Sequence, residues 1–499
     1  MAGAQVACGR SRGVVMSVES SLRAFGIAEV IVSLKAVTPG SELGFSGESR
    51  SAVEDLGQYF TSTDSSIGGM LAATEGALAA PPAYRVYQNL GLVLGTIDES
   101  GLKGLKADKS VDEVHEAPEL SLIKPIESAA ATVTVPRNVT WGIQKLGVPE
   151  LWNRGYTGKG VLVGHLDTGV DGKHKAFLKG AIAQFAKFDD LGNIVPGAKA
   201  TDSGTHGTHT AGTILGRPID GVEFGVAPGA QLISAMVIEG GHIVARVLGG
   251  MDWCVGRGVK ILNMSLGLRG FDTSFLQLMQ AIRSRGILPV IAVGNEGPGT
   301  SRSPGNYDLV LSVGAASKAD MVALFSSSQK INRPADPVVP DIVGPGVDVI
   351  SAAAGGAFST LSGSSMATPH IAGLAALLWE AKPDATVDEI EHAILQSCVR
   401  PPSMPQNRAN RGVPNALEAL RLLNPSAAAM APAKPAKKAA GKTAASKKAA
   451  GKKPAAKKTT SKQPAGKKKA PPKAGSAAKK AKAKTPASAA KRTGKSARK

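Results

Sequence analysis

The sequence predicts an α/β protein with a doubly wound, mainly parallel sheet, preceded by a small α+β domain and followed by a disordered basic tail. Three observations lead to this prediction. Short apolar runs alternate with helical patterns between residues 141 and 423, which is typical of a parallel sheet covered by helices on both faces. A shorter mixed segment precedes this region, and the composition changes abruptly after Pro425.

The N-terminal region divides into three stretches. Residues 1–25 contain no sustained apolar run, so we expect disorder there and find no ordinary signal peptide. Residues 26–124 alternate strand-like and helix-like patterns in the order β-α-β-β-α-β, which predicts a small α+β domain. A loose connector follows at 125–138. The chain also lacks the run of about 18 apolar residues that a membrane span needs, so an intracellular location is favoured over non-classical export.

The central region, residues 139–424, carries six apolar runs of strand length with helical periodicity between several of them, for example at 244–255. In an open parallel sheet, ligands bind at the carboxyl ends of the strands. Polar residues that directly follow a predicted strand are therefore the first candidates for a functional site. The predicted strands are Val161–Leu166, Gln231–Val237, Val259–Met264, Leu288–Val293, Leu309–Val313 and Val347–Ile350.

The basic charge of the chain is concentrated in its tail. Residues 426–499 hold 24 of the 59 Lys and Arg residues and no acidic residue, so the rest carries 59 − 24 = 35 basic against 39 acidic groups. A Lys/Ala/Pro-rich segment buries too little apolar surface to fold, and we expect 425–499 to be disordered. The tail resembles those of linker histones and bacterial histone-like proteins, which implies nonspecific contacts with DNA or RNA phosphates through 426–499. A solubilising role, or attraction to other anionic surfaces, remains an alternative.

Three polar residues lie at strand ends or helix starts. Asp167 directly follows the run 161–166, His206 opens the motif HGTH, and Ser365 lies in GSSMATP, ahead of an apolar helical segment. A serine hydroxyl becomes a nucleophile when a base that is oriented by a carboxylate removes its proton. Taken singly, Ser365 is also explained as a helix cap, and His206 with His209 as a metal-binding pair, although no HExxH pattern surrounds them.

These three motifs, in the order Asp, His, Ser, resemble those of the subtilisin-like serine proteases, the subtilase or S8 family. The resemblance covers about residues 139–424. It implies a serine endopeptidase that forms an acyl-enzyme and needs no cofactor, with Asp167, His206 and Ser365 as the catalytic triad. Asn295, in the motif AVGNEG, matches the family's oxyanion-hole asparagine. The rival interpretation is an architectural nucleic-acid-binding protein in which the basic tail dominates.

The resemblance also implies a binding surface for protein or peptide substrates. In the family, the motif NMSLG belongs to a strand that pairs with the substrate backbone, and this assigns substrate binding to Ser265, Leu266 and Gly267. A second stretch forms one wall of the pocket for the residue before the cut, and it corresponds to Ala292, Val293 and Gly294.

Two further expectations follow from the family. Residues 26–124 resemble its inhibitory propeptide, which assists folding, blocks the cleft and is cut off by the enzyme itself, here within 125–138; a permanent accessory domain is the alternative. The stretch 213–227 lacks the Asn-rich calcium loop of secreted bacterial subtilisins. No metal is therefore assigned, although a structural calcium ion elsewhere remains open.

Overall fold

The structure is a computed structural model that describes residues 17–35, 55–61, 83–127, 138–178, 180–334 and 336–429. Residues 1–16 and 430–499, which include most of the two segments expected to be disordered, lie outside this part of the chain. None of the helices within the described ranges is long and apolar enough to cross a membrane.

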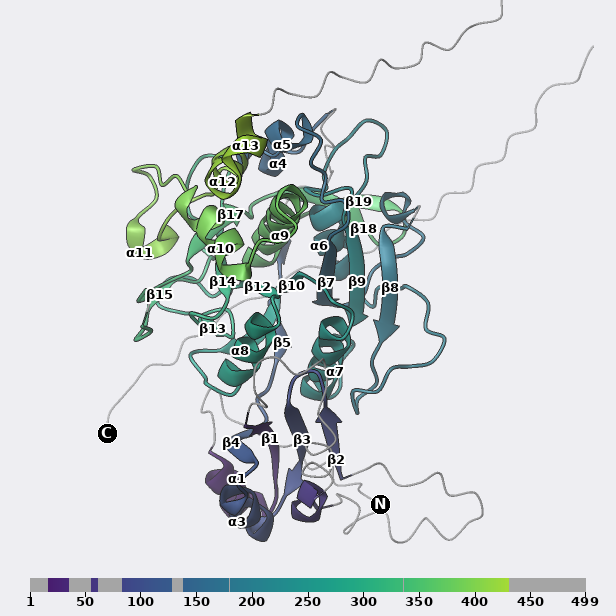
Figure 1. Ribbon diagram of the computed structural model, residues 1–499, viewed down its shortest axis with the longest axis vertical. Coiled ribbons are helices and arrows are strands. Elements are labelled where there is room, and N and C mark those ends of the chain that lie inside the picture. The colour runs from purple at the N-terminus through teal and green to yellow at the C-terminus, as the bar shows by residue number, and fades with distance from the viewer. Residues whose placement is uncertain are drawn as a thin grey trace, which may run out of the picture. The chain divides into compact units, whose positions relative to one another are not determined.

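The centre of the fold is a seven-stranded sheet in the order β17-β14-β12-β10-β7-β9-β8, and every strand pair in it is parallel (Figure 1). The predicted α/β class with a doubly wound sheet is thereby confirmed. The inner strands are buried along nearly their whole length because helices cover both of their faces. In chain order the strands are β7 (Leu162–Asp167), β8 (Ile182–Lys187), β9 (Gln231–Met236), β10 (Ile261–Met264), β12 (Leu288–Ala292), β14 (Leu311–Ala316) and β17 (Ile342–Pro345).

Two strands of this sheet had not been predicted, and one predicted strand belongs elsewhere. β8 was missed because it is an edge strand with exposed polar side chains rather than an apolar run. β17, at the other edge, was missed because Gly344 and Pro345 interrupt its apolar run. The run Val347–Ile350 contributes to β18 (Val349–Ala353), which pairs antiparallel with β19 (Ala357–Ser362) outside the main sheet.

Helices cover both faces of the sheet, and each face has its own apolar core. One face packs against α6 (His206–Leu215) and α9 (Ser364–Ala381), with α10 (Val387–Gln396) and α12 (Ala416–Leu423) outside them. The other face packs against α7 (Ile243–Val255) and α8 (Leu276–Ser284). Shorter helices are α4 (Trp141–Lys145), α5 (Pro149–Trp152), η4 (Lys175–Phe177), α11 (Gln406–Ala409) and α13 (Pro425–Ala429).

The N-terminal region contains a four-stranded antiparallel sheet in the order β2-β3-β1-β4. Val30, Val32 and Val93 on one face pack against its helices, whereas Ile31 and Leu94 on the other face join the core formed by α7 and α8. The elements are α1 (Val18–Phe25), β1 (Ala28–Leu34), η1 (Gly57–Tyr59), β2 (Tyr84–Tyr87), β3 (Leu92–Ile97), α3 (Glu99–Ala107) and β4 (Val111–Glu116).

Regular structure occurs within three segments in which the sequence predicts none. Helix α1 lies within 1–25, where disorder was expected, because Ser17 caps its first turn. Helix α13, with Ala427 buried, lies beyond 424. Within the expected connector, β6 (Ile126–Glu127) pairs with β19.

Three small sheets complete the described fold. β5 (Ser121–Leu122) and β13 (Arg302–Ser303) flank β11 (Leu266–Arg269), and both pair with it antiparallel. β6, β19 and β18 form the second sheet, and β15 (Gln329–Lys330) pairs with β16 (Val338–Val339) in the third. The segment 121–127 therefore connects two of these sheets.

Candidate active site

The candidate catalytic residues lie at the carboxyl edge of the parallel sheet. Asp167 is the last residue of β7, and Asn295 follows the end of β12 by three positions. His206 is the first residue of α6 and Ser365 the second residue of α9, the two helices that pack together on one face. Because strand ends and helix starts meet at the same edge of an open sheet, residues far apart in the sequence come together here.

Asp167 and His206 form a buried hydrogen-bonded pair. His206 Nδ1 is 2.7 Å from Asp167 Oδ1, and the backbone N–H of Thr168 donates to the same carboxylate oxygen at 2.7 Å. Burial opposes ionisation of Asp167, but the nearby His206 imidazole and the hydrogen bonds outweigh it and lower the pKa of Asp167 to about 2. The carboxylate is therefore charged at neutral pH and holds the imidazole with Nδ1 as the donor.

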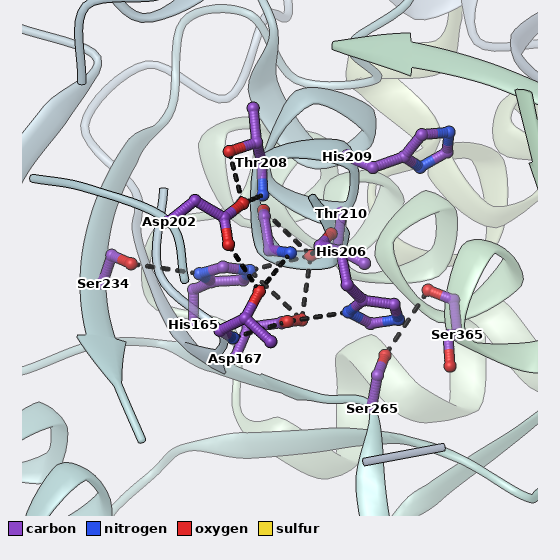
Figure 2. A network of polar contacts seen from close by, with 12 residues as sticks. His165, Asp167, Asp202, His206, Thr208, His209, Thr210, Ser234, Ser265 and Ser365 are labelled. Carbon is purple, nitrogen blue, oxygen red and sulfur yellow. Dashed lines mark hydrogen bonds and ion pairs between the residues drawn. The ribbon is translucent and has the colours of Figure 1, made fainter. Parts of the chain in front are cut away.

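A second carboxylate fixes the start of α6 next to β7. Asp202 Oδ2 accepts a hydrogen bond from the backbone N–H of Thr208 at 2.7 Å (Figure 2). Asp202 Oδ1 accepts one from the Thr168 hydroxyl at 2.7 Å. The Thr168 hydroxyl oxygen in turn accepts from the backbone N–H of Gly207 at 2.9 Å. A carboxylate at a helix N-terminus satisfies free N–H groups and the positive end of the dipole. These bonds set the position of His206.

Ser365 is fully buried in the first turn of α9, and its hydroxyl donates to the carbonyl oxygen of Ile123 at 2.8 Å. His206 Nε2 is buried and has no hydrogen-bond partner among the described residues. The pair Asp167–His206 is thus formed, whereas the serine hydroxyl is engaged by a peptide carbonyl instead of by the imidazole.

Helix α9 begins at Ser364, so Pro369 lies in its second turn. Because proline has no N–H, the carbonyl of Ser365 loses its partner four residues ahead. The hydroxyl of Ser265 donates to that carbonyl at 3.4 Å (Figure 2).

Asn295 is oriented by Ser364. Its side-chain oxygen accepts hydrogen bonds from the backbone N–H of Ser364 at 2.8 Å and from the Ser364 hydroxyl at 2.9 Å. With the oxygen so occupied, the amide Nδ2 turns outward and donates to the carbonyl oxygen of Lys124 at 3.0 Å. The amide group therefore faces a peptide carbonyl next to the one that Ser365 contacts.

A short stretch of the chain itself lies against the expected substrate-binding strand. Leu266 and Gly267 pair antiparallel with Leu122 and Ser121, and the N–H of Ile123 donates to the carbonyl of Ser265 at 3.0 Å. The side chain of Ile123 is fully buried. Main-chain pairing of this kind is how an extended peptide is held at a sheet edge.

The other expected binding residues, Ala292, Val293 and Gly294, are buried at the end of β12. At Gly294, φ is +123°, and an added Cβ would lie 2.7 Å from the Ser327 hydroxyl, so glycine is required by both backbone and space. The carboxylate of Glu296, the residue after Asn295, accepts a hydrogen bond from Arg302 Nε at 2.9 Å. Its negative charge is already compensated.

The metal alternative for His206 and His209 finds no support in the geometry. His209 Nε2 is 3.0 Å from the carbonyl oxygen of Val349, and burial lowers the pKa of His209 to about 3, so it is a neutral packed side chain. Within the described ranges, no group of three or more His, Cys, Asp or Glu side chains is arranged to hold a metal ion.

A family model described as the subtilase family matches residues 158–422, which is more than half of the chain. This chain belongs to the subtilase family. Among its relatives are the M-protease of Shouchella clausii (strain KSM-K16), 35% identical over 278 residues, 55% of this chain and 68% of the relative. Subtilisin Savinase of Lederbergia lenta is 36% identical over 250 residues, covering 50% and 86%, and subtilisin E of Bacillus subtilis (strain 168) is 31% identical over 309 residues, covering 60% and 73%.

Membership in the subtilase family makes the chain a serine endopeptidase, as predicted. The comparisons give no support to the alternative of an architectural nucleic-acid-binding protein. Subtilases act without an organic cofactor, and protein substrates are the expected partners.

Sequence reasoning missed four residues near this site. Ser364 orients Asn295, Ile123 contacts Ser365, and Thr210 and His165 form a buried chain behind Asp167. Ser364 lies inside the motif GSSMATP, but the motif assigns a role to Ser365 only. For Ile123 nothing in the local pattern signals a contact 242 residues away, and for Thr210 and His165 nothing signals that their side chains meet.

Proposed function

We propose that this subtilase hydrolyses peptide bonds with Ser365 as nucleophile, His206 as general base, Asp167 as the carboxylate that orients the base, and Asn295 as an oxyanion donor. One observation supports this assignment above the others: the Ser365 hydroxyl is 2.8 Å from a peptide carbonyl oxygen of the chain itself. The buried, unpartnered Nε2 of His206 is the group that would take the hydroxyl proton.

The proposed reaction uses only groups of the chain and water. His206 Nε2 takes the proton of Ser365 as Oγ attacks the carbonyl carbon, and Asp167 stabilises the imidazolium that forms. Asn295 Nδ2 and the backbone N–H of Ser365, at the start of α9, donate to the developing oxyanion. His206 then protonates the leaving amine, and water hydrolyses the acyl-enzyme by the same steps. A structural calcium ion, which the family admits, would add stability without entering these steps.

Replacement of the nucleophile tests the proposal. Peptides released from a denatured protein mixture by the wild type and by Ser365→Ala are identified by mass spectrometry, with Ser397→Ala, a buried serine at the end of α10, as the control. We expect the wild type and Ser397→Ala to release the same peptides and Ser365→Ala to release none. Equal release by Ser365→Ala would refute the assignment.

We further propose that residues 26–124 are an inhibitory domain that the enzyme removes itself. The support is that 121–124 lies along the expected substrate-binding residues, with carbonyl oxygens at Ser365 and Asn295. The N–H of Ile123 donates to the carbonyl of Ser265, and the carbonyl of Ile123 accepts from the Ser365 hydroxyl. These two bonds favour cleavage after Ile123 over cleavage within 125–138. The carbonyl of Lys124 contacts Asn295, so the peptide bond after Lys124 is the competing cleavage site.

Processing of the purified full chain tests this proposal. The wild type should shorten from the N-terminus, Ser365→Ala should stay full length, and N-terminal sequencing should locate the new end at Lys124. Ile123→Asp should slow processing because it places a charge at a fully buried position, whereas Lys124→Ala, at an exposed position, should not. Identical processing of Ser365→Ala in isolation would show that another protease makes the cut.

The basic tail remains a proposal from the sequence, since residues 430–499 lie outside the described part of the chain. We infer that 426–499 attracts DNA or RNA without base recognition, because it offers lysines but no aromatic side chain for stacking. In a gel-shift experiment, Ser365→Ala protein should bind duplex DNA less tightly at higher salt, and deletion of 426–499 should abolish binding. Unchanged binding after the deletion would contradict the inference.

A further inference from the structure

His165 lies beside the candidate triad but has no part in the proposed steps. It is on β7, two positions before Asp167, and its side chain is fully buried. Burial of a histidine is unfavourable unless both ring nitrogens find partners. Here Nδ1 is 3.1 Å from the Ser234 hydroxyl on β9, and Nε2 is 2.9 Å from the Thr210 hydroxyl on α6 (Figure 2).

The surroundings of Thr210 determine which ring nitrogen carries the proton. Its Oγ1 is 3.0 Å from Asp167 Oδ2, and 3.1 and 3.2 Å from the carbonyl oxygens of Gly207 and His206. All three of these atoms are acceptors, and a threonine hydroxyl has a single proton to donate. That proton is therefore not available to the ring of His165, so the ring must donate to Oγ1.

The same reasoning extends to Ser234. Burial lowers the pKa of His165, so the ring is neutral at pH 7 and has one N–H. With that N–H at Nε2, Nδ1 is an acceptor and receives the hydroxyl proton of Ser234. The result is a one-way series of donors, from Ser234 to His165 to Thr210 to Asp167.

We propose that His165 is a positioning residue that acts on Asp167 through Thr210, by donating to the Thr210 hydroxyl and so directing that hydroxyl at Asp167 Oδ2. The inference rests on the proposed role of Asp167. Without the ring N–H, the Thr210 hydroxyl oxygen accepts no hydrogen bond from His165. Its proton can then turn away from Asp167 toward the carbonyl of Gly207 or His206. A donor that itself accepts a hydrogen bond is also the stronger donor.

This arrangement complements the bonds on the other carboxylate oxygen. Oδ1 accepts from His206 and from the backbone of Thr168, whereas Oδ2 accepts from the Thr210 hydroxyl at 3.0 Å, with His165 Nε2 farther away at 3.6 Å. A carboxylate held at both oxygens keeps its plane fixed, and the imidazole bonded to it keeps its direction. The expected benefit is therefore in the chemical step and not in substrate binding.

The test compares variants of the full chain, with kcat counted per active site titrated by an irreversible serine-directed inhibitor. His165→Leu should lower kcat about five- to tenfold, the worth of one hydrogen bond, and leave KM unchanged. His165→Gln, whose amide nitrogen can reach the same hydroxyl, should recover most of that loss. Val163→Ala, a buried apolar change on the same strand, is the control for destabilisation alone and should keep wild-type kcat.

A double-mutant cycle tests whether the effect passes through Thr210. Thr210→Val should lower kcat by a similar factor, and adding His165→Leu to it should cause no further loss. Additive losses, equal losses for His165→Leu and His165→Gln, or wild-type kcat for His165→Leu would each overturn the proposal. If His165→Leu does not fold, the kcat values of Thr210→Val and Thr210→Ser are compared instead, because only the serine keeps the hydroxyl. Equal kcat values for these two variants would overturn the proposal.

These outcomes are distinguishable from a failure of the proposed function. If Ser365→Ala remained active, or if the inhibitor did not label Ser365 in the wild type, the assigned triad itself would be wrong. If Ser365→Ala is inactive while His165→Leu keeps wild-type kcat, the assigned triad stands and only the proposed role of His165 is wrong.

Discussion

The oxygen and the nitrogen of the Asn295 side-chain amide have separate roles. Ser364 holds its oxygen through two hydrogen bonds, and this leaves Nδ2 directed at a peptide carbonyl. An amide that is fixed before the reaction loses no orientational freedom when charge develops on the carbonyl oxygen. Ser364 therefore acts on the candidate oxyanion site even though it is not the nucleophile.

Asn295→Ala should lower kcat by about 10²–10³, the range found when one oxyanion donor is removed from a subtilisin, with KM little changed. The donor is worth most when the oxygen is charged, so the transition state loses more than the bound substrate. Steady-state kinetics with a peptide substrate measure both constants. A rise in KM at constant kcat would show that Asn295 binds the substrate rather than stabilising the transition state.

At this scale, sequence and structure differ in what they can show. The motifs around Asp167, His206, Ser365 and Asn295 were readable because the family keeps them as local strings. The bonds that orient these residues were not readable, because they join side chains from separate elements. Thr210 illustrates this, since its hydroxyl meets Asp167 only after α6 has packed against β7.

Helices α6 and α9 carry buried histidines whose protonation opposes folding. Burial lowers the pKa of His209 on α6 to about 3 and that of His370 on α9 to about 4. In the unfolded chain both histidines should have a pKa of about 6.5. The unfolded state therefore binds more protons than the folded state between these values, and stability falls as the pH drops below about 6.5.

We predict that the free energy of unfolding of Ser365→Ala protein, chosen to prevent self-digestion, decreases between pH 7 and pH 4. Adding His370→Gln should make that decrease smaller, because one group that must be neutral in the fold no longer titrates. Urea unfolding followed by circular dichroism at several pH values measures the difference. Parallel pH profiles for the two proteins would contradict the assigned cause.

Among the elements, long apolar runs were predicted well and short or edge strands were not. β7, β9, β10 and β12 are buried on both faces, so apolar residues dominate their sequences. β8 lies at an edge, and its exposed positions admit Gln184, which breaks the apolar pattern. The run at 347–350 was recognised as a strand, but its pairing with β19 depends on contacts that a strand pattern does not contain.

Across the whole described chain, the N-terminal sheet and the subtilase domain share one apolar core on the α7 and α8 side. Polar contacts accompany it. The backbone N–H of Asn89 donates to Asp252 Oδ1 at 2.7 Å, its amide donates to Asp252 Oδ2 at 3.2 Å, and Tyr87 donates its hydroxyl to the carbonyl of Ala245 at 3.2 Å. Burial raises the pKa of Asp252, so its carboxylate depends on the two donors of Asn89.

Asn89→Ala should raise the dissociation constant of the cleaved N-terminal domain about tenfold, because the half-buried carboxylate of Asp252 loses a side-chain donor. The rate at which peptidase activity appears after dilution of the processed complex measures this. Lys103→Ala, an exposed change on α3, serves as the matched control and should behave as the wild type. Identical recovery in the two variants would show that the contact at Asp252 does not contribute to retention.

The segment 121–127 pairs with β11 before the candidate bond and with β19 after it. A bond held from both sides within its own chain is presented at an effective concentration that dilution does not change. The first cut is therefore expected to be a first-order event with a half-time independent of protein concentration, whereas every later substrate must be captured from solution. The molecule's first turnover and its subsequent turnovers would then obey different rate laws.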